Sequence, residues 1–368
     1  MPLPFDDLSR WPDHESPELL ASDAADRLIL DESVDACDAT APGEIVVLGD
    51  HYGALTLAAA YDGARGIRVH QDMLSAERAL AANAVTTELT GTFTSMPLDA
   101  SLVAGARVVL LRLPRSLAAL RDYASLIAAH AHSDVVVFAG GRLKHMTTSM
   151  NDVLREFFTT VDVTHARQKS RVLIARGPHD GVDPAPRMQQ HAGLLTVCAF
   201  GGAFADTSID IGTRLLVENL PEQLPAEAID LACGTGVVAA MMALRNPDVR
   251  VYATDQSAAA VASTAATVAA NGVADRVTIV RDDALSLRAD ASADFIALNP
   301  PFHVGAAIHE GAALPLFTDA ARVLRSGGEL WTVWNSPLQY RAALERIVGP
   351  TRQIVRNAKF TVTASTRR

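Results

Sequence analysis

Residues 227–246 read EAIDLACGTGVVAAMMALRN. An apolar run leads into a glycine turn and then into an alanine-rich segment, an order that predicts a strand, a tight turn and a helix. Strand-like and helix-like runs go on alternating along the chain: 249–255, 257–272, 276–283, 293–301, 314–328 and 329–335. This alternation predicts an α/β domain with an open, doubly wound and mainly parallel sheet.

The N-terminal half of the chain repeats this pattern in a weaker form. Residues 45–60, IVVLGDHYGALTLAAA, parallel residues 228–243, AIDLACGTGVVAAMMA. Matching residues lie 183 to 188 positions apart: Gly53 and Gly236, Asp72 and Asp255, Asn83 and Asn271, Pro114 and Pro301, and Gly140 and Gly327. A nearly constant offset indicates a duplication, so we predict two tandem domains of the same fold.

The two copies differ at the turns where ligands bind in such sheets. The first copy has GDHYG at 49–53 where the second has CGTG at 233–236, and RLPR at 112–115 where the second has NPPF at 299–302. We therefore predict a degenerate domain over 1–190 and a catalytic domain over 191–368. The Pro, Gly and polar residues of 177–193 suit a linker between them.

Length and composition favour a cytoplasmic protein with two hydrophobic cores. The chain has 368 residues, of which 49% are hydrophobic. Its three cysteines lack CxxC or metal-ligand spacing, which fits a reducing compartment and predicts no bound metal. The acidic N-terminus does not resemble a signal peptide, and no apolar run reaches the length of about 18 residues expected of a membrane span.

The charge distribution argues against a broadly basic nucleic-acid-binding surface. The formal net charge is −10 at pH 7. Residues 339–368 are an exception, with seven basic side chains and only Glu345 as an acid. This segment is either a solvated helix face and tail or a contact with phosphates.

The glycine turn predicts a nucleotide-type ligand at the start of a helix. Glycine lets the backbone approach a ligand closely, and a helix N-terminus offers free N–H groups. Gly234 and Gly236 fit the dinucleotide fingerprint, in which pyrophosphate binds at this point. Asp230 would repel a pyrophosphate, but its carboxylate can accept from the ammonium group of S-adenosylmethionine. A purely structural tight turn is the third interpretation.

Two acidic positions later in the chain fit either ligand. Asp255 follows the glycines by about 20 residues and can bind both ribose hydroxyls, or it can cap the helix that follows it. Of the neighbours Asp282 and Asp283, we prefer Asp283 as the acceptor for an adenine amino group.

The NPPF stretch places a rigid loop at the end of a strand. The Asn299 side-chain oxygen and the Pro300 carbonyl can accept hydrogen bonds from both N–H groups of a planar amine. Pro300 and Pro301 fix the direction of the loop, and Phe302 can stack on a flat base. The alternative is a strand terminator with a core phenylalanine.

Together these motifs give a chain that resembles the class I methyltransferases acting on guanine N2 of bacterial ribosomal RNA. Further familial stretches are LLASDAADRLIL at 19–30, GGAFADTSIDIGTRLL at 201–216, LNPPFHVG at 298–305, SGGELWTVWN at 326–335 and NAKFTV at 357–362. The resemblance implies two Rossmann-like methyltransferase folds, the first degenerate and supporting RNA binding. It also implies S-adenosylmethionine as cofactor, ribosomal RNA or a ribosomal subunit as partner, and a monomer.

The resemblance further implies a set of site residues. The expected catalytic residues are Asn299, Pro300, Pro301 and Phe302. The expected cofactor-binding residues are Phe204, Asp210, Asp230, Ala232, Cys233, Gly234, Gly236, Asp255, Gln256, Asp283, Ala284 and Asn299. The stretch 201–216 also implies that Thr213 lies near the cofactor. Ala232 stands where the family usually has glycine, and we expect its methyl group to be tolerated.

Three other functions stay open on the sequence. A methyltransferase acting on a protein glutamine amide or a small amine would present the same pair of N–H groups. A nicotinamide dehydrogenase would use the glycine fingerprint, although the two-proline loop and the lack of a Tyr-Lys or His pair near it oppose this. A non-catalytic RNA-binding protein with two inactive folds is the third.

Overall fold

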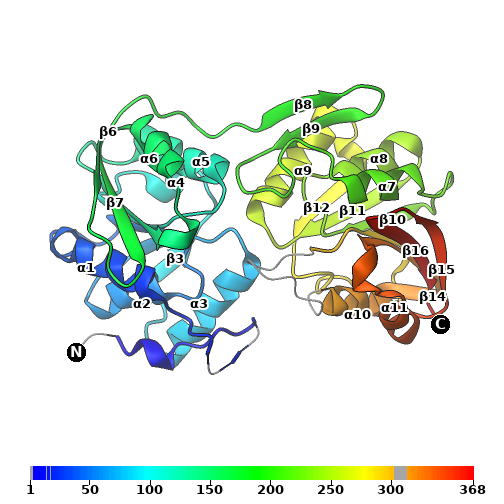
Figure 1. Cartoon of the computed structure of the whole chain (residues 1–368), viewed down its shortest axis with the longest axis horizontal. Coiled ribbons are helices and arrows are strands. Elements are labelled where there is room, and N and C mark those ends of the chain that lie inside the picture. Colours follow the sequence, from blue (N-terminus) through cyan, green and yellow to red (C-terminus); the bar gives the residue numbers. More distant parts are fainter. Residues whose placement is uncertain (1–2, 14, 17, 302–312) are drawn as a thin grey trace. The chain divides into compact units, whose positions relative to one another are not determined.

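The computed structural model describes residues 3–13, 15–16, 18–301 and 313–368 (Figure 1). The chain divides into two compact units, unit 1 (Met1–Ala185) and unit 2 (Pro186–Arg368). The boundary expected at 190–191 therefore falls inside the first strand of unit 2, β8 (Arg187–His191), which pairs with β9 (Leu195–Ala199).

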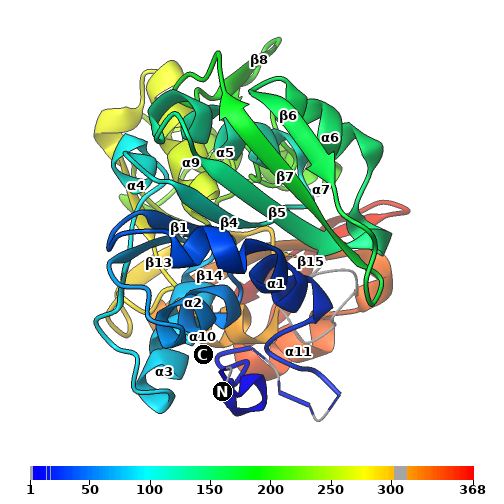
Figure 2. The same cartoon turned by 90° about the vertical axis from the view of Figure 1, so that its left-hand side faces the viewer.

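Unit 1 contains a seven-stranded sheet in the order β3-β2-β1-β4-β5-β7-β6. Strands β1 to β5 pair in parallel, and β7 runs antiparallel to its neighbours β5 and β6, which lie on either side of it in Figure 2. The strands are β1 (Ile45–Leu48), β2 (Ile67–His70), β3 (Phe93–Ser95), β4 (Val108–Arg112), β5 (Val136–Arg142), β6 (Phe158–Val163) and β7 (Ser170–Pro178). The helices are η1 (Phe5–Asp7), α1 (Ala24–Asp38), α2 (Ala54–Tyr61), α3 (Leu74–Thr86), α4 (Ala100–Val103), α5 (Leu117–His130), η2 (Leu143–His145) and α6 (Thr148–Arg155).

Unit 2 contains a second seven-stranded sheet in the corresponding order, β12-β11-β10-β13-β14-β16-β15. Only β16 is antiparallel to its neighbours. The strands are β10 (Glu227–Leu231), β11 (Arg250–Asp255), β12 (Val277–Arg281), β13 (Ala293–Leu298), β14 (Leu324–Asn335), β15 (Thr351–Arg356) and β16 (Phe360–Thr366). The helices are α7 (Ile211–Glu218), α8 (Val237–Arg245), α9 (Ala258–Ala270), η3 (Ala274–Arg276), α10 (Leu314–Val323), η4 (Ser336–Leu338) and α11 (Arg341–Ile347). The predicted tandem doubly wound fold is confirmed.

One hydrogen-bonding arrangement occurs in both units and supports the duplication. The Asn83 amide, at the end of α3, bonds to the backbone N and O of Ser9, with both distances 2.9 Å. The Asn271 amide, just after α9, bonds in the same way to the backbone N and O of Thr196, at 2.9 and 2.7 Å. Each asparagine thus fastens the segment that leads into its own unit.

The predicted match of Gly140 with Gly327 is wrong. In unit 1 Val108 lies opposite Val136, and in unit 2 its counterpart Phe295 lies opposite Glu329. Val136 and Glu329 are 193 residues apart, so the offset in this strand exceeds the offset of 187 on which the match rested.

The shift arises before β14. The Gly105 N–H donates to the His130 carbonyl in unit 1, and the Ser292 N–H donates to the Val323 carbonyl in unit 2. The two donors are 187 residues apart and the two acceptors 193, so the extra residues of unit 2 precede the end of α10. The start of β14 is irregular as well. The pairing passes from Ala293–Leu324 to Phe295–Glu329, which leaves extra residues of β14 without partners on β13. Residues 324–328, which the sequence assigns to the preceding helix, belong to this strand, and α10 ends at Val323. The Gly327 φ angle of 83° allows the irregular backbone.

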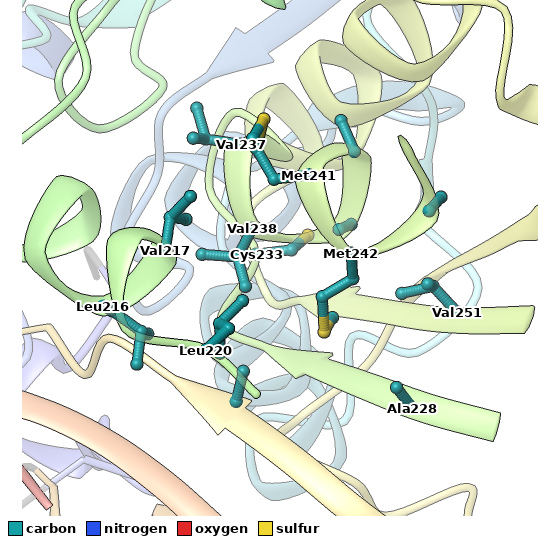
Figure 3. Packing of buried hydrophobic residues seen from close by; sticks show 14 of the residues in the cluster. Leu216, Val217, Leu220, Ala228, Cys233, Val237, Val238, Met241, Met242 and Val251 are labelled. Atoms are coloured by element: carbon teal, nitrogen blue, oxygen red, sulfur yellow. The ribbon is translucent and has the colours of Figure 1, made fainter. Parts of the chain in front are cut away.

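Each sheet is covered by apolar side chains on both faces. In unit 2 one face packs against α7, α8 and α9, and the other against α10 and α11. Figure 3 shows Leu216 and Val217 of α7, Val238 and Met242 of α8, and Val251 of β11 on the first face. Alanine is frequent in α8 and α9, which lets these helices approach the sheet closely and compensates for the small number of aromatic residues.

Within the described residues, no helix has the length and apolar character needed to cross a bilayer.

Candidate functional site

The expected cofactor residues gather where β10, β11 and β13 end. Leu231 of β10 pairs with Thr254 of β11 and with Leu298 of β13. The glycine turn, Asp255 and Asn299 follow these three paired residues along the chain, so they lie at the same edge of the sheet. Ligands of open α/β sheets bind at this carboxyl edge.

Asp230 is a buried carboxyl group at the end of β10, with 2% of its surface exposed. Its Oδ2 accepts a hydrogen bond of 2.8 Å from the backbone N–H of Ala239, in the first turn of α8. Burial raises the pKa of Asp230 to about 8; the bond from Ala239 lowers it, and the nearby charge of Asp255 raises it. A cation placed beside this carboxyl group would favour its charged form.

The two glycines of the turn have different surroundings. A Cβ atom on Gly236 would lie 2.8 Å from Cγ2 of Thr264, so this glycine allows α8 to start directly against α9. A Cβ atom on Gly234 would meet no atom within 4 Å, so this position faces open space. Gly234 is therefore the position where a ligand could approach the backbone.

Ala232 and Cys233 contribute to the turn mainly through their backbones. Ala232 has a φ angle of 59°, a conformation that costs an L-residue roughly 1–2 kcal/mol. The N–H of Cys233 donates to the Thr254 carbonyl at 3.0 Å, and Thr264 Oγ1 donates to its sulfur at 3.2 Å. Burial raises the pKa of the Cys233 thiol, which behaves as part of the core.

Asp255 joins the glycine turn to the start of α9. Its Oδ2 accepts from the Gly234 N–H at 3.0 Å, and its Oδ1 accepts from the Ser257 N–H at 2.9 Å. The cap of α9 is Ser257, whose hydroxyl accepts from the Ala260 N–H at 3.1 Å, so Asp255 supports the cap residue and is not itself the helix cap. The same carboxylate holds Gly234 in place at the open side of the turn.

Asp282 and Asp283 have different roles. Asp282 is 1% exposed and accepts hydrogen bonds within its own loop, from the N–H groups of Asp283 and Leu287 and from the Ser286 hydroxyl. Asp283 Oδ1 instead accepts from Gln256 Nε2 at 3.2 Å, directly after β11. The Oε1 atom of Gln256 is buried and has no hydrogen-bond partner among the described residues.

Ala284 completes this part of the site through its backbone. Its φ angle is 54°, and its carbonyl accepts from Thr254 Oγ1 at 3.2 Å. The loop after β12 is thereby fastened to the end of β11.

Asn299 directly follows β13. Its Nδ2 donates to Thr213 Oγ1 at 2.8 Å, whereas its Oδ1 is buried and has no hydrogen-bond partner in the part of the chain that the structure describes. Leaving a buried carbonyl oxygen without a partner costs about 1–3 kcal/mol, so this atom is a prepared acceptor. Pro300 is buried and Pro301 is exposed, while Phe302 lies outside the described residues.

Phe204 lies before α7, and Asp210 lies at the start of this helix. Phe204 is 61% exposed, which is unusual for such a large apolar side chain. Asp210 caps α7, because its Oδ2 accepts from the N–H groups of Gly212 at 2.8 Å and Thr213 at 3.2 Å. Asp210 therefore acts on the position of Thr213, a residue whose bond to Asn299 no local sequence motif reveals.

Unit 1 lacks the corresponding groups. Val47 occupies the place of Asp230, and Arg112 occupies the place of Asn299. The Arg112 guanidinium is 17% exposed and forms ion pairs with Asp23, at 2.6 Å, and with Asp26. This end of β4 thus holds an ion-paired cluster of one arginine and two aspartates in place of a free amide oxygen.

The comparisons with known proteins cover both units. The model of the RLMG N-terminal domain matches residues 4–179, and that of the methyltransferase small domain matches 194–364. A protein of Streptomyces avermitilis named ribosomal RNA large subunit methyltransferase G is 34% identical, over 96% of this chain and 95% of the relative. The chain belongs to the ribosomal RNA large subunit methyltransferase G family.

Other members of the methyltransferase G family match equally widely. The protein of that name in Shewanella amazonensis is 32% identical, over 97% of this chain and 94% of the relative. Among solved structures, the T. thermophilus 16S rRNA N2 methyltransferase RsmC, in complex with AdoMet and guanosine, has a TM-score of 0.73. The match covers 94% of this chain and 92% of the RsmC chain, at 21% sequence identity. This establishes that the two proteins share the tandem fold.

Proposed function

We propose that this protein transfers a methyl group from S-adenosylmethionine to the exocyclic N2 amine of a guanine in large-subunit ribosomal RNA. Membership of the methyltransferase G family supports methyl transfer to that RNA. Guanine N2 is the acceptor expected from the sequence, and N2 is also the atom named for the T. thermophilus structural neighbour.

The unpaired side-chain oxygen of Asn299 is the observation that carries the proposal. A buried amide oxygen without a partner fits a ligand that donates an N–H group, and it adds no charge that would attract a metal or repel a base. The Pro300 carbonyl follows directly, so two acceptors can orient the two N–H groups of one planar amine. Such alignment lowers a bimolecular barrier by as much as about 7–11 kcal/mol.

The residues at the end of β10 fit S-adenosylmethionine. Asp230 offers a buried carboxyl group for an ammonium, and Gly234 offers open space next to free backbone. Asp255 lies beside Gly234 for the ribose, and Asp283 lies one strand further for the adenine amine. The bound cofactor supplies a methyl group on a positively charged sulfur, which is already an activated leaving group.

A guanine inside a duplex cannot reach Asn299, so the target base must be unpaired or flipped out of its stem. Asn299 and Pro300 then hold the amine, and Phe302 provides a surface for the base. Because an amide is not a base at neutral pH, the proton of the methylated nitrogen leaves to solvent.

Replacing Asn299 by alanine tests this proposal. We expect the Asn299→Ala variant to lose roughly 100-fold or more in kcat, a much larger effect than any change in its Kd for S-adenosylmethionine. Methylation is mapped by mass spectrometry on ribosomal RNA. The RNA comes from a strain that lacks the protein and is complemented with either the original protein or the Asn299→Ala variant. Undiminished guanine methylation by the variant, or a product found on protein glutamine, would refute the proposal.

For unit 1, residues 1–190 as drawn from the sequence, we propose a supporting contact with the RNA backbone. Five basic side chains lie near the end of β5 and the start of β7, and no ion pair joins any of them to a described residue: Arg115, Arg142, Lys144, Lys169 and Arg171. Phosphate contacts of this kind weaken with added salt. Arg142→Glu with Lys144→Glu should lower RNA affinity at least about tenfold, whereas Arg155→Glu on α6 should not.

We also propose that the protein works as a monomer in the cytoplasm. Light scattering of the purified chain with and without an RNA fragment tests the first statement. Fractionation of cells followed by detection of the protein tests the second.

A further inference from the structure

We infer that Thr213 is a positioning residue for the proposed reaction, because it holds the Asn299 amide with its oxygen toward the acceptor amine. The inference rests on the proposed function and adds a residue outside the motif that binds the base. Its basis is the single hydrogen bond, 2.8 Å long, that the structure shows for the Asn299 side chain.

The orientation of this amide decides whether it can assist the reaction. An asparagine side chain can turn over and exchange its oxygen and nitrogen with almost no change in shape. With the oxygen toward the ligand it accepts from an amine, whereas with the nitrogen there it opposes one N–H group with another. In the structure Thr213 Oγ1 accepts from Nδ2, so the amide has the first orientation and its Oδ1 is left for a ligand.

The position of Thr213 is itself fixed. Asp210 caps the first turn of α7 and bonds to the N–H of Thr213 at 3.2 Å. A Cβ atom on Gly212 would lie 3.0 Å from Cε1 of Phe360, so this turn lies directly against β16. Further along α7, Leu216 and Val217 are buried in the core. The hydroxyl therefore sits on a helix that has little freedom to move.

Unit 1 has a contact at the same place made by different residues, so this contact belongs to the fold and not only to the site of unit 2. Asp23 caps α1 as Asp210 caps α7, and Asp26 pairs with Arg112 as Thr213 pairs with Asn299. Each of these correspondences has the same offset of 187 residues. Unit 1 thus keeps the contact between the first turn of this helix and the end of the fourth strand, but makes it with ion pairs in place of a neutral hydrogen bond.

Two substitutions at Thr213 test the contribution of its hydroxyl group separately from that of its branched side-chain shape. Valine keeps the branched form and removes the hydroxyl, while serine keeps the hydroxyl. We expect Thr213→Val to lower kcat about 10- to 100-fold, with the KM for RNA and the Kd for S-adenosylmethionine changed less than about threefold. Thr213→Ser should retain kcat within about threefold, and Thr318→Val on α10 serves as the matched control for loss of an exposed hydroxyl.

A double-mutant cycle with Asn299→Ala, followed in single turnovers with excess enzyme, identifies the partner through which Thr213 acts. If Thr213 works through Asn299, adding Thr213→Val to Asn299→Ala causes no further loss, because the interaction is already gone. A full additional loss would overturn the inference, as would normal kcat in Thr213→Val or failure of serine to restore it. Full activity of Asn299→Ala alone would instead refute the proposed function.

Discussion

The backbone nitrogen of Gly234 donates to Oδ2 of Asp255 at 3.0 Å, which fastens the glycine turn after β10 to the end of β11. From the sequence, the spacing of these two residues suggests that both bind the same ligand. The structure shows that they are also bonded directly to each other. This bond gives the carboxylate a structural task besides any contact with ribose.

Replacing Asp255 by asparagine separates these two tasks. The amide oxygen of Asn can still accept one of the two backbone hydrogen bonds, so we expect the free energy of unfolding to fall by only about 1 kcal/mol. Loss of a charged acceptor for two ribose hydroxyls should weaken S-adenosylmethionine binding at least about tenfold. Calorimetry of binding and thermal unfolding of the free protein measure the two effects. Unchanged cofactor affinity would leave Asp255 only with its bonds to the backbone of Gly234 and Ser257.

The two glycines of the turn should respond differently to alanine. Gly236→Ala places a Cβ atom 2.8 Å from Thr264, and we expect it to destabilise unit 2 by about 2 kcal/mol or more. Gly234→Ala meets no protein atom and should cost only about 1 kcal/mol through its positive φ angle, yet it should weaken cofactor binding markedly. Unfolding curves and binding isotherms of both variants decide the matter. Tight binding by Gly234→Ala would show that the open space is not used by the cofactor.

Asp230 should make the free protein less stable as the pH rises. Its pKa in the folded chain is about 8, above the ordinary value of 3.8. Between these two pH values the folded chain keeps a proton on Asp230 that the unfolded chain has lost. The free energy of unfolding therefore falls as the pH rises through this range. Asp50 of unit 1, with a pKa raised to about 6 by burial, acts in the same direction over a lower range. The loss between pH 6 and pH 8 should therefore come mainly from Asp230 and amount to about 1–3 kcal/mol.

The Asp230→Asn variant checks this assignment. Its amide oxygen can still accept from Ala239, so its unfolding temperature should vary less between pH 6 and pH 8 than that of the original protein. Asp50→Asn is the matched control and should change the profile only below about pH 6. The same dependence on pH in Asp230→Asn as in the original protein would contradict the raised pKa.

Arg112 should matter for stability and not for the proposed chemistry. Arg112→Ala leaves Asp23 and Asp26 without their cation in a half-buried place, which should destabilise unit 1 by about 3 kcal/mol. The Kd of S-adenosylmethionine should not change, because Arg112 belongs to the other unit. Differential calorimetry with and without cofactor tests both statements, and a weakened cofactor affinity would contradict the second.

Much of the fold is visible in the sequence because it follows from periodicity. Alternating apolar and alanine-rich runs predict the parallel sheets, and the repeated spacing of Gly53 and Gly236 predicts that there are two of them. The erroneous match of Gly140 with Gly327 shows the limit of this method. The second half has six more residues between Pro301 and Val323 than the first half has between Pro114 and His130, and the letters alone do not show where such an insertion interrupts the repeat.

The site is only partly visible in the sequence. The motifs place Asp230, Gly234 and Asn299 on one edge, as parallel topology requires. The difference between Gly234 and Gly236 depends on the side chain of Thr264, which is distant in sequence. Likewise, Asp282 is engaged by its own loop, and Thr213 meets Asn299 across 86 residues. The family resemblance implies that both residues lie near the cofactor, but not that they are bonded to each other.

The contact between the start of a helix and the end of the fourth strand has a consequence for how the two halves diverged. Arginine with two aspartates secures the join in one half, and asparagine with threonine secures it in the other. Exchanging one set of side chains for the other therefore removes the free amide oxygen of Asn299 while the helix stays attached to the strand, so this part of the site can be lost without loss of the fold.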